Sequence, residues 1–139
     1  MTRKTYIFWG IFITLFSCSS PEKLLNGKSL DRIYFGKTGG FTNISMDYVL
    51  FEKGQLFKMQ HDSLINIHRI SRKQIKTLDS LIKTAEFEKL NLNETGNITY
   101  YIKTESTGTE KEIKWSDSTD NELIKDIYKV LLESIKSNP

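Results

Sequence analysis

Two histidines, His61 and His68, are the only imidazole side chains in this 139-residue chain. A catalytic zinc site needs about three protein ligands, and a serine nucleophile needs a histidine that a carboxylate orients. The two histidines are seven residues apart, an odd spacing that puts them on opposite faces of an extended segment. No His-Glu-x-x-His or Gly-x-Ser-x-Gly motif accompanies them. We therefore expect no metal site, no cofactor and no catalytic residues.

The sequence also lacks the residue patterns for phosphate binding and for paired-carboxylate catalysis. The segment Gly36-Lys37-Thr38 ends like a P-loop, but Asp31 stands where the first glycine is required, so its glycine is expected to be a turn residue. No two carboxylates stand side by side at a buried strand end; Asp47 comes nearest to such a position, but its neighbours Met46 and Tyr48 predict that it points to solvent. A small hydrolase of cell-wall or surface glycan, using carboxylates or His61, stays open as an alternative.

The single cysteine, Cys18, follows an export-type segment. Arg3 and Lys4 precede the apolar residues 6–16, and a helix over those eleven residues would cover roughly 17 Å of a bilayer core about 30 Å thick. The stretch is therefore the apolar region of a signal peptide rather than a membrane span. One thiol also excludes a disulfide scaffold and a cysteine-based zinc site.

The tetrapeptide Leu15-Phe16-Ser17-Cys18 resembles the lipobox of bacterial lipoproteins. The resemblance implies cleavage after Ser17, acylation of Cys18 by palmitate-type chains, and anchoring to the inner or outer membrane of a Gram-negative cell envelope. The division is then a signal peptide over 1–17, a tether over 18–29 and one domain over 30–139. An ordinary secretory signal, or an uncleaved anchor with an incidental Cys18, is the alternative.

Charge gives little reason to expect nucleic-acid binding. The formal net charge is +3, and removal of residues 1–17 takes away Arg3 and Lys4 and no acid, which leaves +1. Nucleic-acid binding usually needs a clustered basic face. The basic run at 68–73 is expected to be a solvated face at the start of a helix. The remaining partners to consider are an envelope protein or a glycan.

Alternating apolar residues predict a set of short strands. Glycines 36–40 are expected to end the first strand, and Gly54 is expected to supply the positive φ of a hairpin turn. The predicted strands cover 30–35, 44–51, 56–60, 64–70, 98–104 and 109–115.

Two amphipathic helices are predicted from capping boxes followed by apolar residues at helical spacing. Ser71 and Gln74 begin a helix over 72–88, and Thr119 and Glu122 begin a closing helix with apolar residues from Leu123 to Ile135. The element order, with hairpins between strands, predicts an α+β domain in which a mostly antiparallel sheet of about five or six strands packs on two amphipathic helices.

Aromatic side chains are concentrated in the predicted strands. Consecutive rings in a strand point to opposite faces, so helices on one face leave rings exposed on the other. We expect a partner surface on the helix-free face and the 36–41 loop, with Phe41, Tyr48 and Tyr101 as its binding residues. Simple core and cross-strand packing of these rings is the alternative.

Short Asp-Ser patterns resemble the acceptor used for O-glycosylation in some Gram-negative envelopes. Ser63 and Ser118 follow aspartates in expected loops, so they are the candidate modification sites. The pattern Gly39-Gly40-Phe41-Thr42, with Gly96-Asn97-Ile98-Thr99-Tyr100 and Trp115, resembles small bacterial lipoproteins of no known activity. This likeness supports the fold and implies no mechanism.

The sequence favours a membrane-anchored envelope lipoprotein whose domain is a non-enzymatic binding or accessory module. The hydrolase described above is one alternative. A periplasmic inhibitor or immunity protein is another, and it differs from the first hypothesis only in its partner. A concave pocket with converging titratable groups would favour the hydrolase, and a shallow aromatic surface would favour the module.

Overall fold

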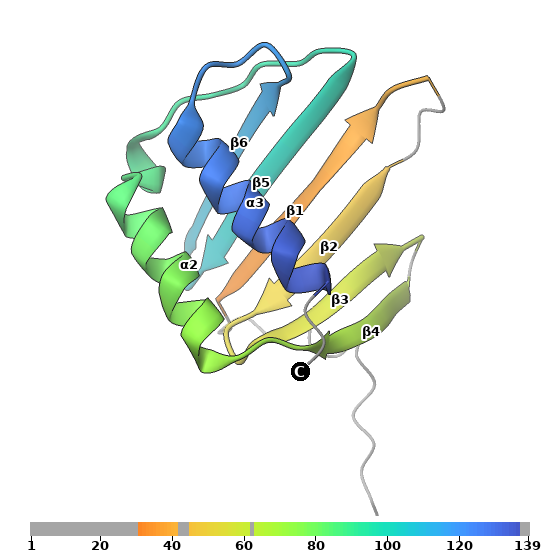
Figure 1. The fold of residues 1–139 in the computed structure, drawn as a ribbon, viewed down its shortest axis with the longest axis vertical. Helices are drawn as coiled ribbons and strands as arrows, with labels where there is room; N and C mark the ends of the chain where they lie inside the picture. The colour runs from red at the N-terminus through yellow and green to blue at the C-terminus, as the bar shows by residue number, and fades with distance from the viewer. Residues whose placement is uncertain (1–30, 42–44, 62, 137–139) are drawn as a thin grey trace, which may run out of the picture.

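The structure is a computed structural model that describes residues 31–41, 45–61 and 63–136 (Figure 1). Positions Leu30 and Ile44 of the predicted strands lie outside the described residues. The elements follow one another as β1 (Arg32–Gly39), β2 (Met46–Phe51), β3 (Gln55–Gln60), β4 (Ser63–Arg69), α2 (Arg72–Thr84), the 3₁₀ turn η1 (Phe87–Lys89), β5 (Ile98–Ser106), β6 (Thr109–Ser116) and α3 (Glu122–Lys136).

The strands form one sheet in the order β4-β3-β2-β1-β5-β6, and every neighbouring pair is antiparallel. The predicted α+β fold is therefore confirmed. Gly54 has a φ of +82° and forms the β2–β3 turn, as expected for a residue without a Cβ. The segment through α2 and η1 carries the chain from the β4 edge back to β5, which pairs with β1.

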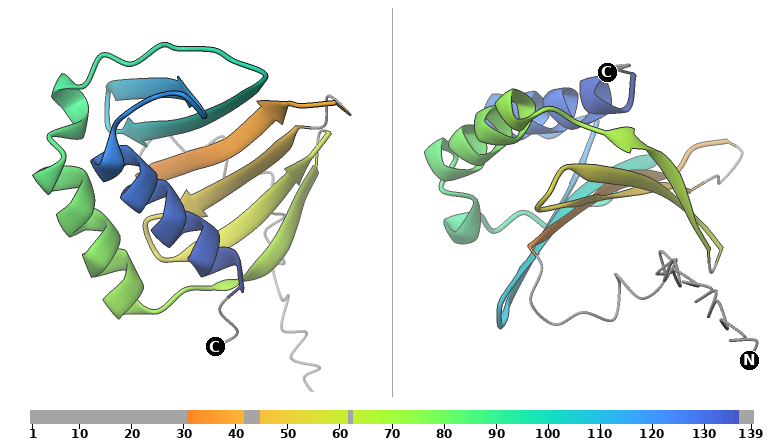
Figure 2. Two further views of the ribbon diagram at one scale, coloured as in Figure 1. Left: turned by 45° about the horizontal axis from the view of Figure 1, so that its top comes forward. Right: turned by 90° about the horizontal axis from the view of Figure 1, so that it is seen from below.

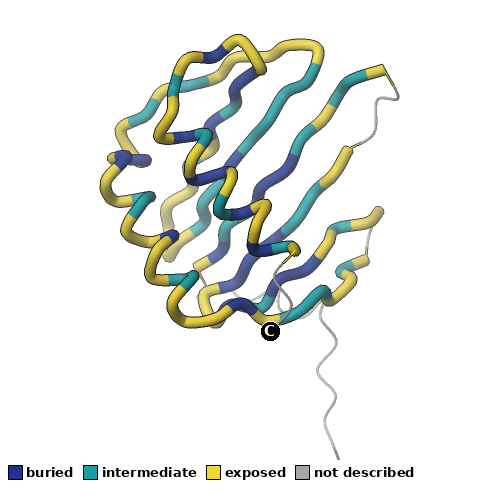
Figure 3. Tube along the Cα trace, in the orientation of Figure 1, coloured by how far each residue is buried: buried dark blue, intermediate teal, exposed yellow. Residues whose placement is uncertain are grey.

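Both helices cover the same face of the sheet (Figure 2). The core between the layers is built from fully buried side chains: Phe35, Ile102 and Ile113 from the sheet, Leu78 from α2, and Ile124, Ile127 and Leu131 from α3. Figure 3 shows buried positions in the central strands and at intervals along α3. Helical spacing thus sets a stripe of α3 against the alternate residues of the strands.

The first helix begins where the sequence predicts. The Ser71 hydroxyl accepts from the Gln74 N–H at 3.3 Å, and the Gln74 side chain accepts from the Ser71 N–H at 2.9 Å, which completes the capping box. The predicted end at residue 88 is wrong, because α2 stops at Thr84 and Glu86 adopts a left-handed φ of +46°. This turn redirects the chain so that Phe87 packs into the core with 1% exposure.

The start of α3 differs from the predicted capping box. Asn121, rather than Thr119, accepts from a helical N–H, that of Ile124 at 3.2 Å. Thr119 instead accepts from the Ser116 N–H at 3.0 Å and donates to Glu94, so it stabilises the loop before the helix. Threonine and asparagine can both cap a helix. Because the Thr119 side chain is engaged in the turn after β6, Asn121 takes this role.

The first strand continues through Gly36 to Gly39, so the prediction that Gly36 ends the strand is wrong. Gly36 pairs with Asp47 of β2 on one side and Tyr101 of β5 on the other. A Cβ at this position would lie 2.2 Å from the Met46 carbonyl oxygen and 3.0 Å from a Tyr101 ring carbon. The glycine therefore serves the close packing of side chains over β1, not a turn.

The helix-free face of the sheet has an apolar half and a charged half. Val49, Phe51 and Phe57 form a small second cluster of buried apolar side chains there. Beside it, Glu105 lies 3.6 Å from the Arg32 guanidinium and 2.9 Å from the Lys103 ammonium. The Arg32–Glu105 pair joins neighbouring strands, the sheet equivalent of helical i,i+4 pairs, whereas Lys103 and Glu105 are two residues apart on β5.

Candidate binding groove beside α3

Four aromatic rings of the sheet and one ring of α3 form a row across β2, β1, β5 and β6. Phe35 stacks on Tyr48 with ring centroids 5.4 Å apart, and Tyr100 stacks on Trp115 at 5.8 Å. Both pairs are cross-strand neighbours in register. The Tyr128 ring of α3 packs edge to face against three of them. Its centroid lies 6.5 Å from that of Phe35, 5.4 Å from that of Tyr100 and 5.3 Å from that of Trp115. The row is continuous from β2 to β6.

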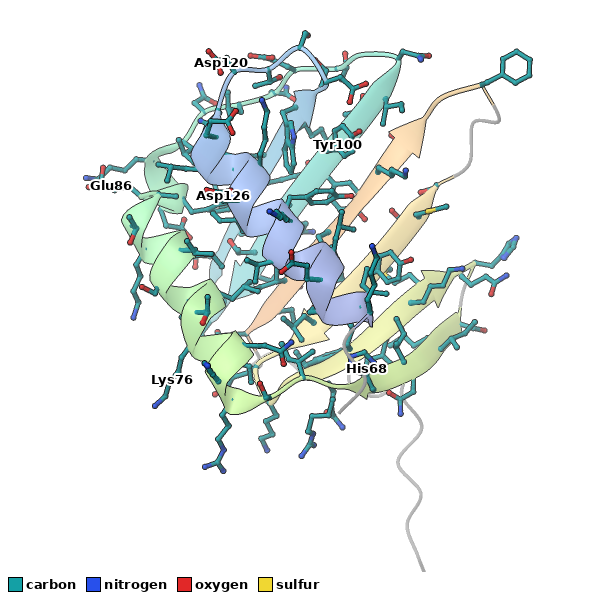
Figure 4. All side chains as sticks on the ribbon, in the orientation of Figure 1. His68, Lys76, Glu86, Tyr100, Asp120 and Asp126 are labelled. Atoms are coloured by element: carbon teal, nitrogen blue, oxygen red, sulfur yellow. The ribbon has the colours of Figure 1, made fainter. Side chains whose placement is uncertain are left out.

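At the β5–β6 end of this row, a groove of about 320 Å³ opens between α3 and the sheet. The sheet side is aromatic and polar, and the helix side presents residues spaced by three, four and seven positions, which share one face of α3. The lining residues are Tyr100, Trp115, Ser116, Asp117, Lys125, Tyr128, Lys129 and Leu132. Figure 4 shows Tyr100 next to α3 at this end of the sheet.

Polar groups at the groove are fixed by specific partners. The Tyr100 hydroxyl donates to Asp117 Oδ1 at 2.8 Å, which holds the ring in place. Burial raises the pKa of the Tyr100 phenol, and the hydrogen bond to Asp117 and the charge of that carboxylate raise it further. Lys125 pairs with Glu122 at 3.1 Å, whereas Lys129 forms no ion pair with any residue that the structure describes. The groove therefore combines a positioned ring, an acceptor and a cation.

The three predicted binding residues do not form one surface. Phe41 is fully exposed beyond the end of β1. Tyr48 faces the helices and packs on Phe35, so its predicted place in a helix-free partner surface is wrong. Tyr101 lies on the opposite face, since its neighbour Ile102 enters the helix-side core. Alternation along β2 sends Tyr48 to the same side as Leu50, which is also in that core.

On the helix-free face, Tyr101 lies across β1 and donates to Asp47 Oδ1 at 2.7 Å. Asp47, predicted to point to solvent, is partly exposed and also accepts from the Ser45 hydroxyl, so two hydroxyl groups hold its carboxylate. Gly36 lies between the two in the register, and its lack of a side chain leaves room for the tyrosine. The pair thus fastens β5 to β2 over the intervening strand.

The Tyr101 phenol should make the domain sensitive to alkali. Burial, followed by the hydrogen bond to Asp47, raises its pKa well above the ordinary value of 10.0. In the unfolded chain this phenol ionises near pH 10, so its contribution to stability is complete below that pH and is lost as the pH rises above it. We expect Tyr101→Phe to remove a slope of about 1.4 kcal/mol per pH unit from the unfolding free energy above about pH 10.

Urea unfolding at pH 8, 10 and 11 measures this effect. The Tyr101→Phe curve should lie below the wild-type curve at pH 8, because the Asp47 hydrogen bond is lost, and the two should converge as the pH rises. Parallel curves over this range would contradict the assignment.

The remaining predicted site residues are separate from the groove or at its border. Ser63 is the exposed first residue of β4 rather than a loop residue, and Ser118 lies in the turn after β6, as predicted. The Ser118 hydroxyl lies 2.8 Å from that of Ser116, a groove residue. His61 is exposed in the turn after β3, and His68 Nε2 lies 2.8 Å from the Ser134 carbonyl of α3. His68 therefore joins β4 to the end of α3.

Sequence reasoning did not identify Tyr100 or the two lysines of α3 as site residues. Lys125 and Lys129 are four positions apart, so their shared face was readable from the sequence. The proximity of these lysines to Tyr100 could not be predicted from the sequence, because it depends on how α3 crosses the sheet. Among the described residues, no group of three or more histidine, cysteine, aspartate or glutamate side chains could hold a metal ion.

Cys18, the predicted signal peptide over 1–17 and the predicted tether over 18–29 lie outside the described residues. Within the described part of the chain, no helix is long and apolar enough to cross a bilayer. No known family model matches this sequence, and no curated protein matches it.

Proposed function

We propose that this protein is a membrane-anchored lipoprotein of the cell envelope and that its folded domain is a non-catalytic binding module. The anchor is supported by the lipobox-like sequence ending at Cys18, preceded by a basic and then an apolar segment. Two or three acyl chains hold a small domain on a bilayer, where one chain would exchange readily. The domain then acts at the membrane surface.

The observation that carries the module hypothesis is the set of aromatic rings at the groove beside α3, whose lining contains one carboxylate, Asp117, rather than the pair that a glycan hydrolase needs. Its three rings, Tyr100, Trp115 and Tyr128, come from two layers of the fold and contact one another. Aromatic residues are enriched at binding surfaces, and small-ligand sites combine apolar walls with a few fixed polar groups. The groove has both features in a volume near the lower end of the range of such sites.

A glycan suits this groove best. A pyranose ring has an apolar face of C–H groups, which packs on an aromatic ring, and a rim of hydroxyls, which need donors and acceptors. Tyr100 provides a half-buried ring, Asp117 an acceptor and Lys129 a donor within the same groove. The hydrogen bond between Tyr100 and Asp117 pre-orders the ring, which lowers the entropy lost on binding.

The Tyr100→Ala variant tests the ligand assignment. We expect the full-length protein in detergent to bind tri-N-acetylchitotriose, a soluble oligomer of a common cell-wall sugar. Truncation of the ring should weaken binding by about tenfold or more, the usual effect of removing an aromatic anchor. Tyr100→Phe, which keeps the ring and loses the Asp117 hydrogen bond, should have a smaller effect. Isothermal titration calorimetry measures all three affinities.

Phe41→Ala is the matched control, because Phe41, which the sequence suggested as a binding residue, is a fully exposed ring that does not line the groove. This control should bind as the wild type does. Equal affinity of Tyr100→Ala and wild type would contradict the groove assignment. If the protein binds one envelope protein stoichiometrically and binds no saccharide, the partner is a protein and the glycan assignment is wrong.

A further inference from the structure

A second concave site lies at the opposite edge of the helix-covered layer, between α2 and the sheet. The start of β1 and the ends of β2 and β5 meet there, next to α2 (Figure 1). The cavity has a volume of about 340 Å³ and shares no residue with the groove beside α3. The cavity is therefore a candidate ligand site that is distinct from the groove of the proposed function.

The floor of this cavity is apolar. Ile33 and Leu50 come from β1 and β2, and Ile75 and Ile82 come from α2 at a spacing of seven residues, which is one face of the helix. These four side chains are partly or fully buried and belong to the main core or pack against it. A hydrocarbon group placed in the cavity would lose water contact on most of its surface.

The rim of the same cavity is acidic. Asp31, Glu52, Asp79 and Glu88 line it from four different segments of the chain, and none of them forms an ion pair with a described residue. Asp31 Oδ1 accepts from the Ser106 hydroxyl at 2.6 Å, which fixes that carboxylate. The rim therefore has four carboxylates, none of which forms an ion pair with a described residue.

Among the residues that line the cavity, Arg32 is the one basic residue, and it is engaged on the other face of the sheet together with Lys103 of β5. Arg32 Nη1 lies 3.3 Å from the Tyr34 hydroxyl and 3.6 Å from Glu105 Oε2, and its guanidinium lies over the Phe51 ring. Lys103 is 2.9 Å from both Glu105 and Glu110. These contacts hold the fifth acid of the cavity, Glu105, in an ion-pair network on the other face. The charge left over at the cavity is negative.

We propose that this cavity binds a small amphipathic amine, with the hydrocarbon body on the isoleucine floor and the ammonium group among the rim carboxylates. The apolar floor selects for a hydrocarbon or ring of modest size, and the rim selects for positive charge. A neutral molecule of the same shape gains only the floor contacts. An anion of the same shape is repelled by the rim.

Three probes with one ring test the charge requirement: cyclohexylamine, cyclohexanol and cyclohexanecarboxylate. We expect cyclohexylamine to shift the δ1-methyl NMR signals of Ile33, Ile75 and Ile82 in the full-length protein, and to bind about tenfold more tightly than cyclohexanol. The carboxylate should give no saturable shift. Because the rim is solvent-exposed, the affinity for the amine should fall between 0.05 and 0.5 M salt, values chosen to span roughly the Debye lengths of about 14 to 4 Å.

The double variant Asp79→Asn/Glu88→Gln keeps the shape of the rim and removes two of its charges. Both residues are exposed, so we expect an intact fold and an affinity for cyclohexylamine about fivefold weaker. Glu133→Gln on α3, an exposed carboxylate outside the cavity, is the control and should bind as the wild type does. All variants are compared in the same detergent, so that partition of the probe cancels.

Equal affinity for the amine and the carboxylate would overturn the proposal. So would unchanged affinity in the double variant, or the absence of saturable shifts at the three isoleucines. Loss of saccharide binding by Tyr100→Ala has no bearing on these outcomes, because the two sites have no residue in common.

Discussion

Replacement of Gly36 by alanine should lower the free energy of unfolding by about 3 kcal/mol. The new Cβ would lie 2.2 Å from the Met46 carbonyl oxygen, which is backbone and moves only if β2 shifts. It would also lie 2.9 Å from Asp47 Oδ1 and 3.0 Å from the Tyr101 ring. The variant therefore combines strand displacement with loss of the Tyr101–Asp47 hydrogen bond, which contributes about 1 kcal/mol by itself.

Urea unfolding at pH 7 measures this loss, with Thr38→Ala as the control. Thr38 is exposed, lies two residues further along β1 and shares the helix-free face with Gly36. The control should change the unfolding free energy by less than about 0.5 kcal/mol. If Gly36→Ala is as stable as this control, the packing of Tyr101 over β1 is not a determinant of the fold.

Replacement of Cys18 by serine should abolish lipid attachment completely. Acylation needs the thiol, and Cys18 is the single cysteine of the chain, so no second site can take the lipid. Each buried acyl CH₂ stabilises membrane binding by about 0.8 kcal/mol, so the loss of two chains removes far more free energy than any surface contact supplies. In cells fed a clickable palmitate analogue, wild type should be labelled and Cys18→Ser should carry no label.

Ser20→Ala is the control for this experiment, since it changes a neighbouring hydroxyl outside the lipobox. It should be labelled as strongly as wild type. Labelling of Cys18→Ser, or no labelling of the wild type in its native host, would contradict the proposed acylation. The comparison is independent of domain stability, because the label is read after denaturation.

The sequence predicts most of the fold because its local signals agree with the final packing. The Ser71 capping box, the turn at Gly54 and the alternation of the strands all reappear in the structure. The error at Gly36 has a physical reason. A glycine in a strand-like segment usually indicates a turn or a break, whereas this one is required by Tyr101, a residue of a distant strand.

The candidate site is less predictable than the fold. Alternation separates the rings of β2 and β5 into two faces, but it does not say which face the helices cover. Tyr48 therefore belongs with Phe35 in the helix-side row, and Tyr101 belongs with Asp47 on the other side. The groove depends further on where α3 crosses β5 and β6, which brings Lys129 and Tyr100 to the same cavity.

The residues of the two cavities come from strand ends, loops and helix faces that are far apart in sequence. Each cavity lies between the sheet and one helix and has a few charged side chains among its lining residues. The groove beside α3 has aromatic walls and lysines, and the cavity below α2 has aliphatic walls and carboxylates.

Intact-mass spectrometry of the protein purified from its native host tests the central claim most directly. We expect a chain of residues 18–139 that carries a diacylglyceryl group on the Cys18 sulfur, with or without a third acyl chain on its amino group. A mass that includes residues 1–17, or a processed chain with an unmodified Cys18, would contradict it.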